Sequence, residues 1–241
     1  MALMPDKMAI HSSRPVSFWS MFASPVATLE SLRDRPQWLI PVLLSATLCV
    51  AVNFYVIRRI GLVRLINAAA QAKAVIDPQA AIQNALAHRS EILTFQALTT
   101  FVSSFVTVLV IAKVLWLLLT LFGWDILFKK ILGIVAHVKL LSVVIRECML
   151  ALTVTLIRDL NTLDLRNPLA TNPAFFFRPT SPAAYRTLSS LDVITLMEIS
   201  LLIVGLTKVC PRLSLWAASL LVVIPWTIYV GATLLLPFLF S

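Results

Sequence analysis

The chain has 241 residues, of which 59% are apolar and only 13% are charged. Soluble domains average roughly 45–50% apolar and about 25% charged residues, and a domain of this size folded in water needs more polar surface than this sequence supplies. The composition indicates a membrane protein and excludes a disordered chain, a disulfide scaffold and a collagen-like fibre. The net charge of +9 is typical of basic ends and loops beside anionic lipid, so we expect no nucleic acid as a partner.

The N-terminal segment, residues 1–37, contains no apolar run of the length that a signal peptide needs, so we expect it to be retained. Apolar residues in its second half recur at helical spacing, which places them on one face of a helix. That face consists of Phe18, Phe22, Leu29 and Leu32. Such a helix either lies as an amphipathic helix in the plane of the lipid headgroups or packs its apolar face against the membrane helices.

The remaining residues, 38–241, form the membrane domain that we predict. A helix needs about 20 apolar residues to cross a hydrocarbon core of roughly 30 Å. The expected spans are residues 38–57, 96–122, 131–157, 188–206 and 215–240. We therefore predict an all-α membrane protein with five transmembrane helices, an odd number that places the two termini on opposite sides of the membrane. Counting Lys and Arg beside the spans does not decide which side the N-terminus takes.

Two segments between the spans are too polar to cross a membrane. Residues 61–91 include Asp77-Pro78, a helix cap followed by proline, so we predict two helices there, Leu62–Ala74 and Pro78–Arg89. Residues 158–186 carry several Asn-Pro and Ser-Pro pairs. Residues before proline disfavour helix, and we predict an irregular loop for this second segment.

Charged residues inside a span cost about 2.5–3.5 kcal/mol each at the helix centre on insertion scales, which makes them candidates for function. We call one such set the polar seam: Lys113, Lys139, Arg146, Glu147 and Glu198. Lys139 and Arg146 are seven residues apart and share one helix face. Arg146, Glu147 and Glu198 fall at similar depth, so we expect either an Arg146–Glu198 pair or a pair centred on Glu147. Lys113 and Lys139 can reach toward lipid phosphate or face water.

The polar seam has two interpretations. Paired charges can fix the register of the helices, which is a structural role, or they can line a hydrated path or a groove for lipid headgroups. The sequence has no metalloprotease, hydrolase, phosphate-loop or CxxC motif, and its three histidines are scattered. We therefore expect no enzymatic activity, no catalytic residues, and no bound cofactor or metal.

Three segments resemble one family of multispan membrane proteins, and the resemblance extends over about residues 17–231. They read FWSMFASPVATLESLRDRPQWLIPVLLSATL, LDLRNPLATNPAFFF and LSSLDVITLMEISLLIVGLTKVCPRLSLWAASLLVVIPWTIYV. Their order and spacing are similar to those of the Yip domain family, the Ypt/Rab-interacting protein family, in its bacterial branch. Glu198 departs from that pattern, since relatives often have an aromatic residue in the fourth span.

The resemblance implies five spans, a cytoplasmic N-terminus and, for a bacterial member, the inner membrane. In eukaryotes the family is linked to Rab GTPases and vesicle traffic, but bacterial members have no Rab system, so we carry over the architecture and not the partner. The expected function is that of a non-enzymatic membrane organiser, scaffold or adaptor. Its expected partners are membrane lipids, with a protein partner or a second copy of the chain also open. The alternative is a transporter, channel or lipid-translocating protein that uses the polar seam.

Overall fold

The computed structural model describes residues 19–72, 78–159, 163–165, 167–177 and 181–239. Within these residues the secondary structure is helical and contains no strand, which confirms the all-α class. The helices are α1 (Ser20–Ala23), α2 (Pro25–Ser31), α3 (Leu39–Ile60), α4 (Leu62–Ala72), α5 (Pro78–Ala87), α6 (Arg89–Leu121), α7 (Phe128–Leu156), α8 (Pro173–Phe177), α9 (Pro182–Ser190), α10 (Val193–Val209) and α11 (Leu215–Leu239).

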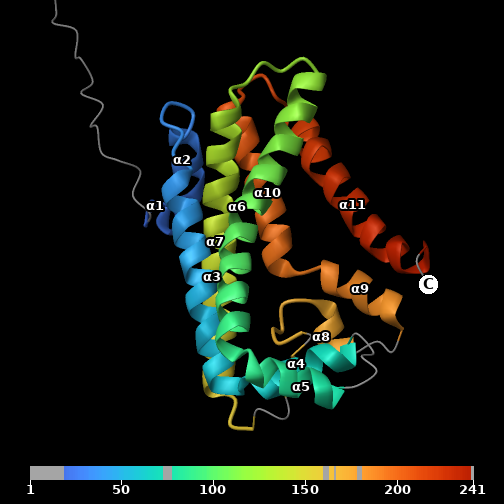
Figure 1. The fold of residues 1–241 in the computed structure, drawn as a ribbon. Helices are drawn as coiled ribbons and strands as arrows, with labels where there is room; N and C mark the ends of the chain where they lie inside the picture. The colour runs from blue at the N-terminus through green and yellow to red at the C-terminus, as the bar shows by residue number, and fades with distance from the viewer. Residues whose placement is uncertain (1–18, 73–77, 160–162, 166, 178–180, 240–241) are drawn as a thin grey trace, which may run out of the picture.

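The long helices run alternately up and down the molecule (Figure 1). Helices α3, α7 and α11 run in one direction, whereas α6 and α10 run in the other. Helices α1 and α2 lie near one end of the bundle, which we call the α2 end. The short helices α4, α5, α8 and α9 lie toward the opposite end, which we call the α5 end. The polypeptide therefore traverses the bundle once in each of its long helices.

Three helices are long and apolar enough to cross a membrane, and they lie in Leu39–Ile60, Arg89–Leu121 and Leu215–Leu235. A fourth candidate joins Ala184–Ser190 to Val193–Val209 across a bend of 48°. Helix α7 has 29 residues and is long enough, but the lysines in its first turn and the charges of the polar seam make it more polar than the others. The structure thus contains helices suited to an integral membrane protein, while the count of five spans stays a prediction.

Two expected elements differ from the structure. The span predicted from residue 188 onward is wrong as one continuous helix, because α9 ends at Ser190 and Asp192 then caps a new helix by accepting a hydrogen bond from the Ile194 amide at 2.7 Å. The predicted irregular loop of residues 158–186 contains α8 and the start of α9. The two helices predicted between the first spans are confirmed as α4, which is described up to Ala72, and α5, which ends at Ala87, two residues earlier than expected.

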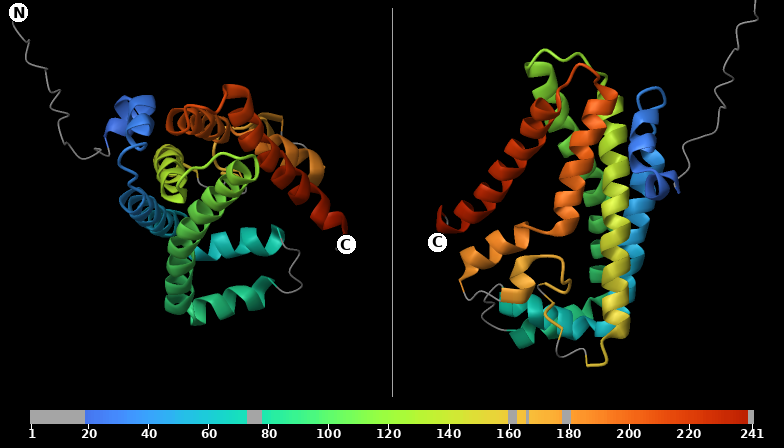
Figure 2. Two further views of the ribbon diagram at one scale, coloured as in Figure 1. Left: turned by 90° about the horizontal axis from the view of Figure 1, so that it is seen from above. Right: turned by 180° about the vertical axis from the view of Figure 1, so that it is seen from behind.

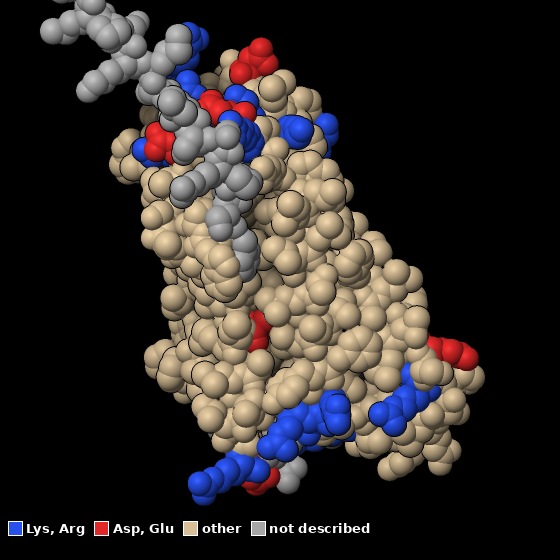
Figure 3. Space-filling view, turned by 90° about the vertical axis from the view of Figure 1, so that its left-hand side faces the viewer, with Lys and Arg blue, Asp and Glu red and all other residues tan. Residues whose placement is uncertain are grey.

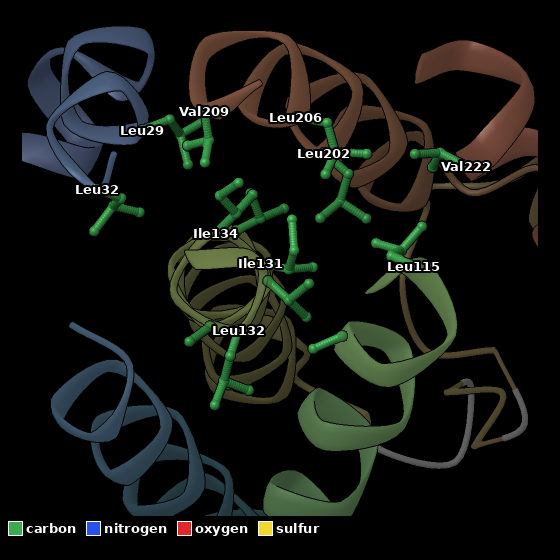
Figure 4. Packing of buried hydrophobic residues seen from close by; sticks show 14 of the residues in the cluster. Leu29, Leu32, Leu115, Ile131, Leu132, Ile134, Leu202, Leu206, Val209 and Val222 are labelled. Carbon is green, nitrogen blue, oxygen red and sulfur yellow. The ribbon is translucent and has the colours of Figure 1, made fainter. Parts of the chain in front are cut away.

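Helix α7 lies at the centre of the bundle and contacts α3, α6 and α10 (Figure 2). Every residue from Ile131 to Val138 is buried, so this stretch of α7 has no side open to lipid. Figure 4 shows Ile131 and Ile134 of α7 pointing toward Leu202 and Leu206 of α10. A central helix that is enclosed by protein can carry polar residues that a lipid-facing helix could not.

Among the glycines of the chain, Gly205 of α10 has the closest neighbours. A Cβ atom added there would lie 2.7 Å from Cγ2 of Ile134 in α7 and 3.5 Å from Cδ1 of Leu29 in α2. Small residues let helix backbones approach closely in membrane proteins. Gly205 therefore brings α10 against both α7 and α2.

The N-terminal apolar face packs into the protein. Leu29 and Leu32 are completely buried in the same core cluster as α7, and α2 contacts α10. Phe22 is partly exposed, at 37%, and Phe18 lies outside the described residues. Of the two alternatives for this helix, packing against the membrane helices is the one observed for Leu29 and Leu32.

One face of the bundle is apolar between two charged ends. Figure 3 shows Lys, Arg, Asp and Glu gathered toward both ends, separated by a band in which almost no charge is visible. Large apolar side chains are exposed along the long helices, including Phe95, Leu98, Val106 and Leu117 in α6 and Leu220, Ile228 and Leu235 in α11. Contiguous exposed apolar surface of this kind fits contact with lipid.

Candidate functional site: ion pairs between two helices

Two ion pairs connect the central helix α7 to α10. The Lys139 Nζ atom lies 2.6 Å from Oε1 of Glu198, and these side chains are 23% and 13% exposed. The Arg146 Nη2 atom lies 3.5 Å from Oδ2 of Asp192, the N-cap residue directly before α10. The second pair is more open, since the Arg146 side chain is 46% exposed. Lys139 and Arg146 thus each have their own carboxylate on the α10 side.

The register of the two helices explains this pairing. Lys139 and Arg146 are separated by seven residues, or about 10 Å along α7, and Asp192 and Glu198 by six residues, or about 9 Å. Because α7 and α10 run in opposite directions (Figure 1), the two spacings match and both pairs form together. The expected Arg146–Glu198 pair is wrong, because Glu198 meets Lys139, which lies seven residues, or about two helix turns, before Arg146.

Asp192 is the member of this site that sequence reasoning missed. Its Oδ1 atom accepts a hydrogen bond from the Ile194 amide at 2.7 Å, and its Oδ2 atom accepts one from Thr171 Oγ1 at 3.2 Å. A carboxylate at a helix N-terminus is also favoured by the helix dipole. An aspartate directly before an apolar run is a recognisable N-cap pattern, so this signal was present in the sequence.

The loop that precedes α8 contacts the same aspartate through Thr171. Asn167 and Asn172 are buried, and their side-chain amides donate to each other's oxygens at 2.9 and 2.8 Å. The Val193 amide donates to the Thr171 carbonyl at 2.9 Å. Buried amides that satisfy each other hold the backbone in one conformation. The loop therefore fixes the position of Asp192 and, through it, the position available to Arg146.

Glu147 turns toward a different helix. It follows Arg146 directly, and successive residues of a helix point about 100° apart. The Cys49 thiol of α3 lies 3.8 Å from the Glu147 Oε1 atom and donates to it. Among the described residues, Glu147 makes no ion pair within 4.0 Å. The pair centred on Glu147 that we expected is thus a contact with a thiol rather than with a cation.

Lys113 does not join the other members of the polar seam. Its Nζ atom lies 4.1 Å from the centroid of the Trp116 ring and 5.6 Å from that of Phe128. Both aromatic residues belong to the α2 end of the bundle (Figure 1). The structure therefore divides the predicted seam into two ion pairs between α7 and α10, a carboxyl facing α3, and a lysine stacked on aromatic rings.

The chemistry that these groups support is electrostatic. His137 is buried in α7, and its Nδ1 atom lies 2.9 Å from the Gly133 carbonyl oxygen of the same helix. In the described part of the chain, no three His, Cys, Asp or Glu side chains are grouped as they would be around a metal ion. The paired charges of α7 and α10 can hold two helices in register within an apolar surrounding.

The fold and the site define a class of protein, an all-α protein whose apolar helices suit a membrane and whose central helix carries paired charges. Comparison with known proteins finds no matching family model, no matching curated protein and no matching solved structure. The resemblance to the Yip domain family therefore stays a prediction from the sequence.

Proposed function

We propose that this protein is a non-enzymatic, five-span integral membrane protein that acts as an organiser, scaffold or adaptor. Helices α3, α6, α7, α10 and α11 are the proposed spans, and their alternating directions (Figure 1) support that count. The resemblance to the Yip domain family adds the bacterial inner membrane and a cytoplasmic N-terminus to the proposal. Membrane lipids are its expected partners, together with a protein partner or a second copy of the chain.

The pairing of the charges between α7 and α10 is the observation that carries this proposal. A path for ions or headgroups needs charges that a passing ligand can contact, whereas Lys139 and Arg146 each already contact a carboxylate. A buried ion pair is close to neutral in net free energy, but removal of one partner can cost roughly 3–5 kcal/mol. Such pairs are suited to setting which helices pack together and in which register, which is what a rigid scaffold requires.

Reversing one ion pair tests the structural role. Lys139→Glu and Glu198→Lys should each lower the melting temperature of the detergent-solubilised protein, and the double variant should recover much of the loss, because the pair is restored with its charges exchanged. Lys208→Gln is a matched control, since its pair with Glu30 is longer, at 3.8 Å, and more exposed. Surface pairs of that kind contribute about 0–1 kcal/mol.

The transporter alternative makes the opposite prediction for a neutral substitution in the same ion pair. If Lys139→Gln kept the melting temperature of the wild type but abolished a flux in reconstituted vesicles, the charges would serve a pathway and the scaffold proposal would fail.

Crosslinking in native membranes tests the adaptor role. We expect a recurrent protein neighbour, identified by mass spectrometry of the crosslinked products. A known membrane complex, crosslinked under the same conditions, is the positive control for the recovery of protein partners. If that control gives its partners and this protein gives lipid adducts alone, the adaptor role is contradicted and the alternative is favoured.

A further inference from the structure

Lys113 lies on the exposed, apolar side of α6. The residues one turn before and after it on that helix, Val110 and Leu117, are both exposed and apolar. Lys113 itself is exposed. In a membrane, lipid covers this face, so the lysine stem lies against lipid and its ammonium group must find a polar environment nearby.

Two aromatic rings fix the position of the ammonium group. Trp116 donates from its Nε1 atom to the Ile126 carbonyl at 3.0 Å, and its ring meets the ring of Phe128 edge to face, with centroids 6.0 Å apart and planes at 77°. Lys113 Nζ lies over the Trp116 ring at 4.1 Å. A cation over an aromatic face is stabilised by the ring quadrupole. The connection between α6 and α7 thus holds Lys113 in one place.

The protein does not neutralise this charge. Within the described residues, no carboxylate oxygen lies within 4.0 Å of Lys113 Nζ, in contrast to Lys139, whose carboxylate is 2.6 Å away. The connection from α6 to α7 and the first turn of α7 carry one carboxylate, Asp125, and two lysines, Lys129 and Lys130. Together with Lys113, the cations outnumber the carboxylate three to one. The local excess of positive charge calls for an anion from outside the protein.

The depth of Lys113 identifies where that anion comes from. Helix α6 has 33 residues and is about 50 Å long, which exceeds a hydrocarbon core of roughly 30 Å by about 20 Å. A centred helix extends about 10 Å beyond the core at each end, and Lys113 lies about 12 Å before the end of α6. Its Cα atom thus falls near the boundary between hydrocarbon and headgroups, where lipid phosphates are found.

We propose that Lys113, held by Trp116 and Phe128, binds the phosphate of an anionic phospholipid at the α2 end of α6, with Lys129 and Lys130 adding positive charge. An ammonium group pairs with a phosphate as a point charge. This inference goes beyond the scaffold role and rests only on the placement of the protein in a membrane. In this proposal Lys113 binds a ligand from outside the protein, whereas Lys139 and Arg146 pair with carboxylates of the protein itself.

Native mass spectrometry of the intact, detergent-solubilised protein tests the site with phosphatidylglycerol as the probe and phosphatidylcholine as the zwitterionic comparison. Wild type should retain phosphatidylglycerol in preference to phosphatidylcholine. Lys113→Gln should weaken phosphatidylglycerol binding about fivefold, the effect of one lysine near a lipid phosphate. Lys113→Arg should retain binding, and Trp116→Leu should weaken it by removing the ring beneath the cation.

Lys208→Gln is the matched control, because that lysine lies toward the same end and is already paired with Glu30. It should bind phosphatidylglycerol as the wild type does. Equal binding by wild type and Lys113→Gln, or equal binding of the two lipids by wild type, would overturn the proposal. Displacement of the lipid by inorganic phosphate at the same concentration would show a site for free phosphate rather than lipid, and would also overturn it.

Membrane insertion is measured separately, by flotation of wild type and Lys113→Gln with vesicles made of phosphatidylcholine alone or with phosphatidylglycerol. Insertion of both proteins without lipid preference would refute the lipid site and leave the proposed membrane role standing. A wild-type protein that stays soluble and monodisperse without detergent would refute the membrane role itself.

Discussion

Asp192 combines two tasks at the scale of a single residue. It caps α10 through one carboxylate oxygen and pairs with Arg146 through the other. Loss of a cap and loss of an ion pair lower the free energy of unfolding by different amounts. The cost is about 1 kcal/mol for a typical cap and more for a partly buried charge left without its partner. Substitutions at this one position can therefore separate the two contributions.

Asp192→Ala should lower the free energy of unfolding more than Asp192→Asn, because asparagine retains a capping oxygen while alanine loses both the cap and the charge. We expect a loss of about 1–2 kcal/mol for asparagine and about 2–4 kcal/mol for alanine, with the exposure of Arg146 reducing the ion-pair part. Denaturant titration in a fixed detergent measures both. Equal losses would show that the cap made by Asp192 contributes nothing measurable beyond its charge.

The two glutamates of the polar seam should respond differently to neutral substitution. Glu198→Gln leaves Lys139 without its carboxylate and should lower the free energy of unfolding by about 3 kcal/mol. Glu147→Gln removes no ion pair among the described residues and should cost less than about 1 kcal/mol. The same titration compares them, and a larger loss for Glu147→Gln would contradict the pairing seen here.

At the scale of the elements, α7 is held from several sides by α3, α6 and α10. Its contact with α10 depends on two features, the ion pairs toward the α5 side and Gly205 nearer the α2 end. The ion pairs set the register of α7 and α10 along their axes, and Gly205 sets how closely the two helices approach. Both features act on the same pair of helices, so they cooperate in placing α10 against the centre of the bundle.

Gly205→Ala should destabilise the protein by about 1–3 kcal/mol, because the new methyl group would overlap Cγ2 of Ile134. The double variant Gly205→Ala with Ile134→Ala should lose less than the sum of the single losses, since the second change removes the overlapping atom. Gly231→Ala is the matched control in α11, where nothing lies within 4 Å of an added Cβ atom. Thermal unfolding of the four variants tests this, and strictly additive losses would argue against a close approach at Gly205.

At the scale of the whole molecule, the alternation of the long helices places the described ends of the chain apart. The described part of the chain begins at the α2 end, in α1 and α2, and its last helix, α11, leaves that end and runs toward α9 (Figure 1). Five traverses of a membrane bring the two termini to opposite sides. The proposed topology is therefore a property of the complete fold and not of any one helix.

Reporters fused to the two termini should lie in different compartments, with the N-terminal one cytoplasmic. A reporter that functions only in the cytoplasm and one that functions only outside it, each placed at both ends, measure this. Two termini in the same compartment would refute the five-span topology. The same result would leave the ion pairs between α7 and α10 unaffected, because they are tested by stability.

The sequence by itself determined the class of the protein and the places of most helices, because apolar composition, helical spacing and proline signals act locally along the chain. It also showed that Lys139 and Arg146 share a helix face. Only the tertiary structure decided that Glu198 meets Lys139, that Asp192 meets Arg146, and that Lys113 stands apart on aromatic rings. Those pairings depend on the rotation and vertical offset of one helix against another, which spacing within a single helix does not specify.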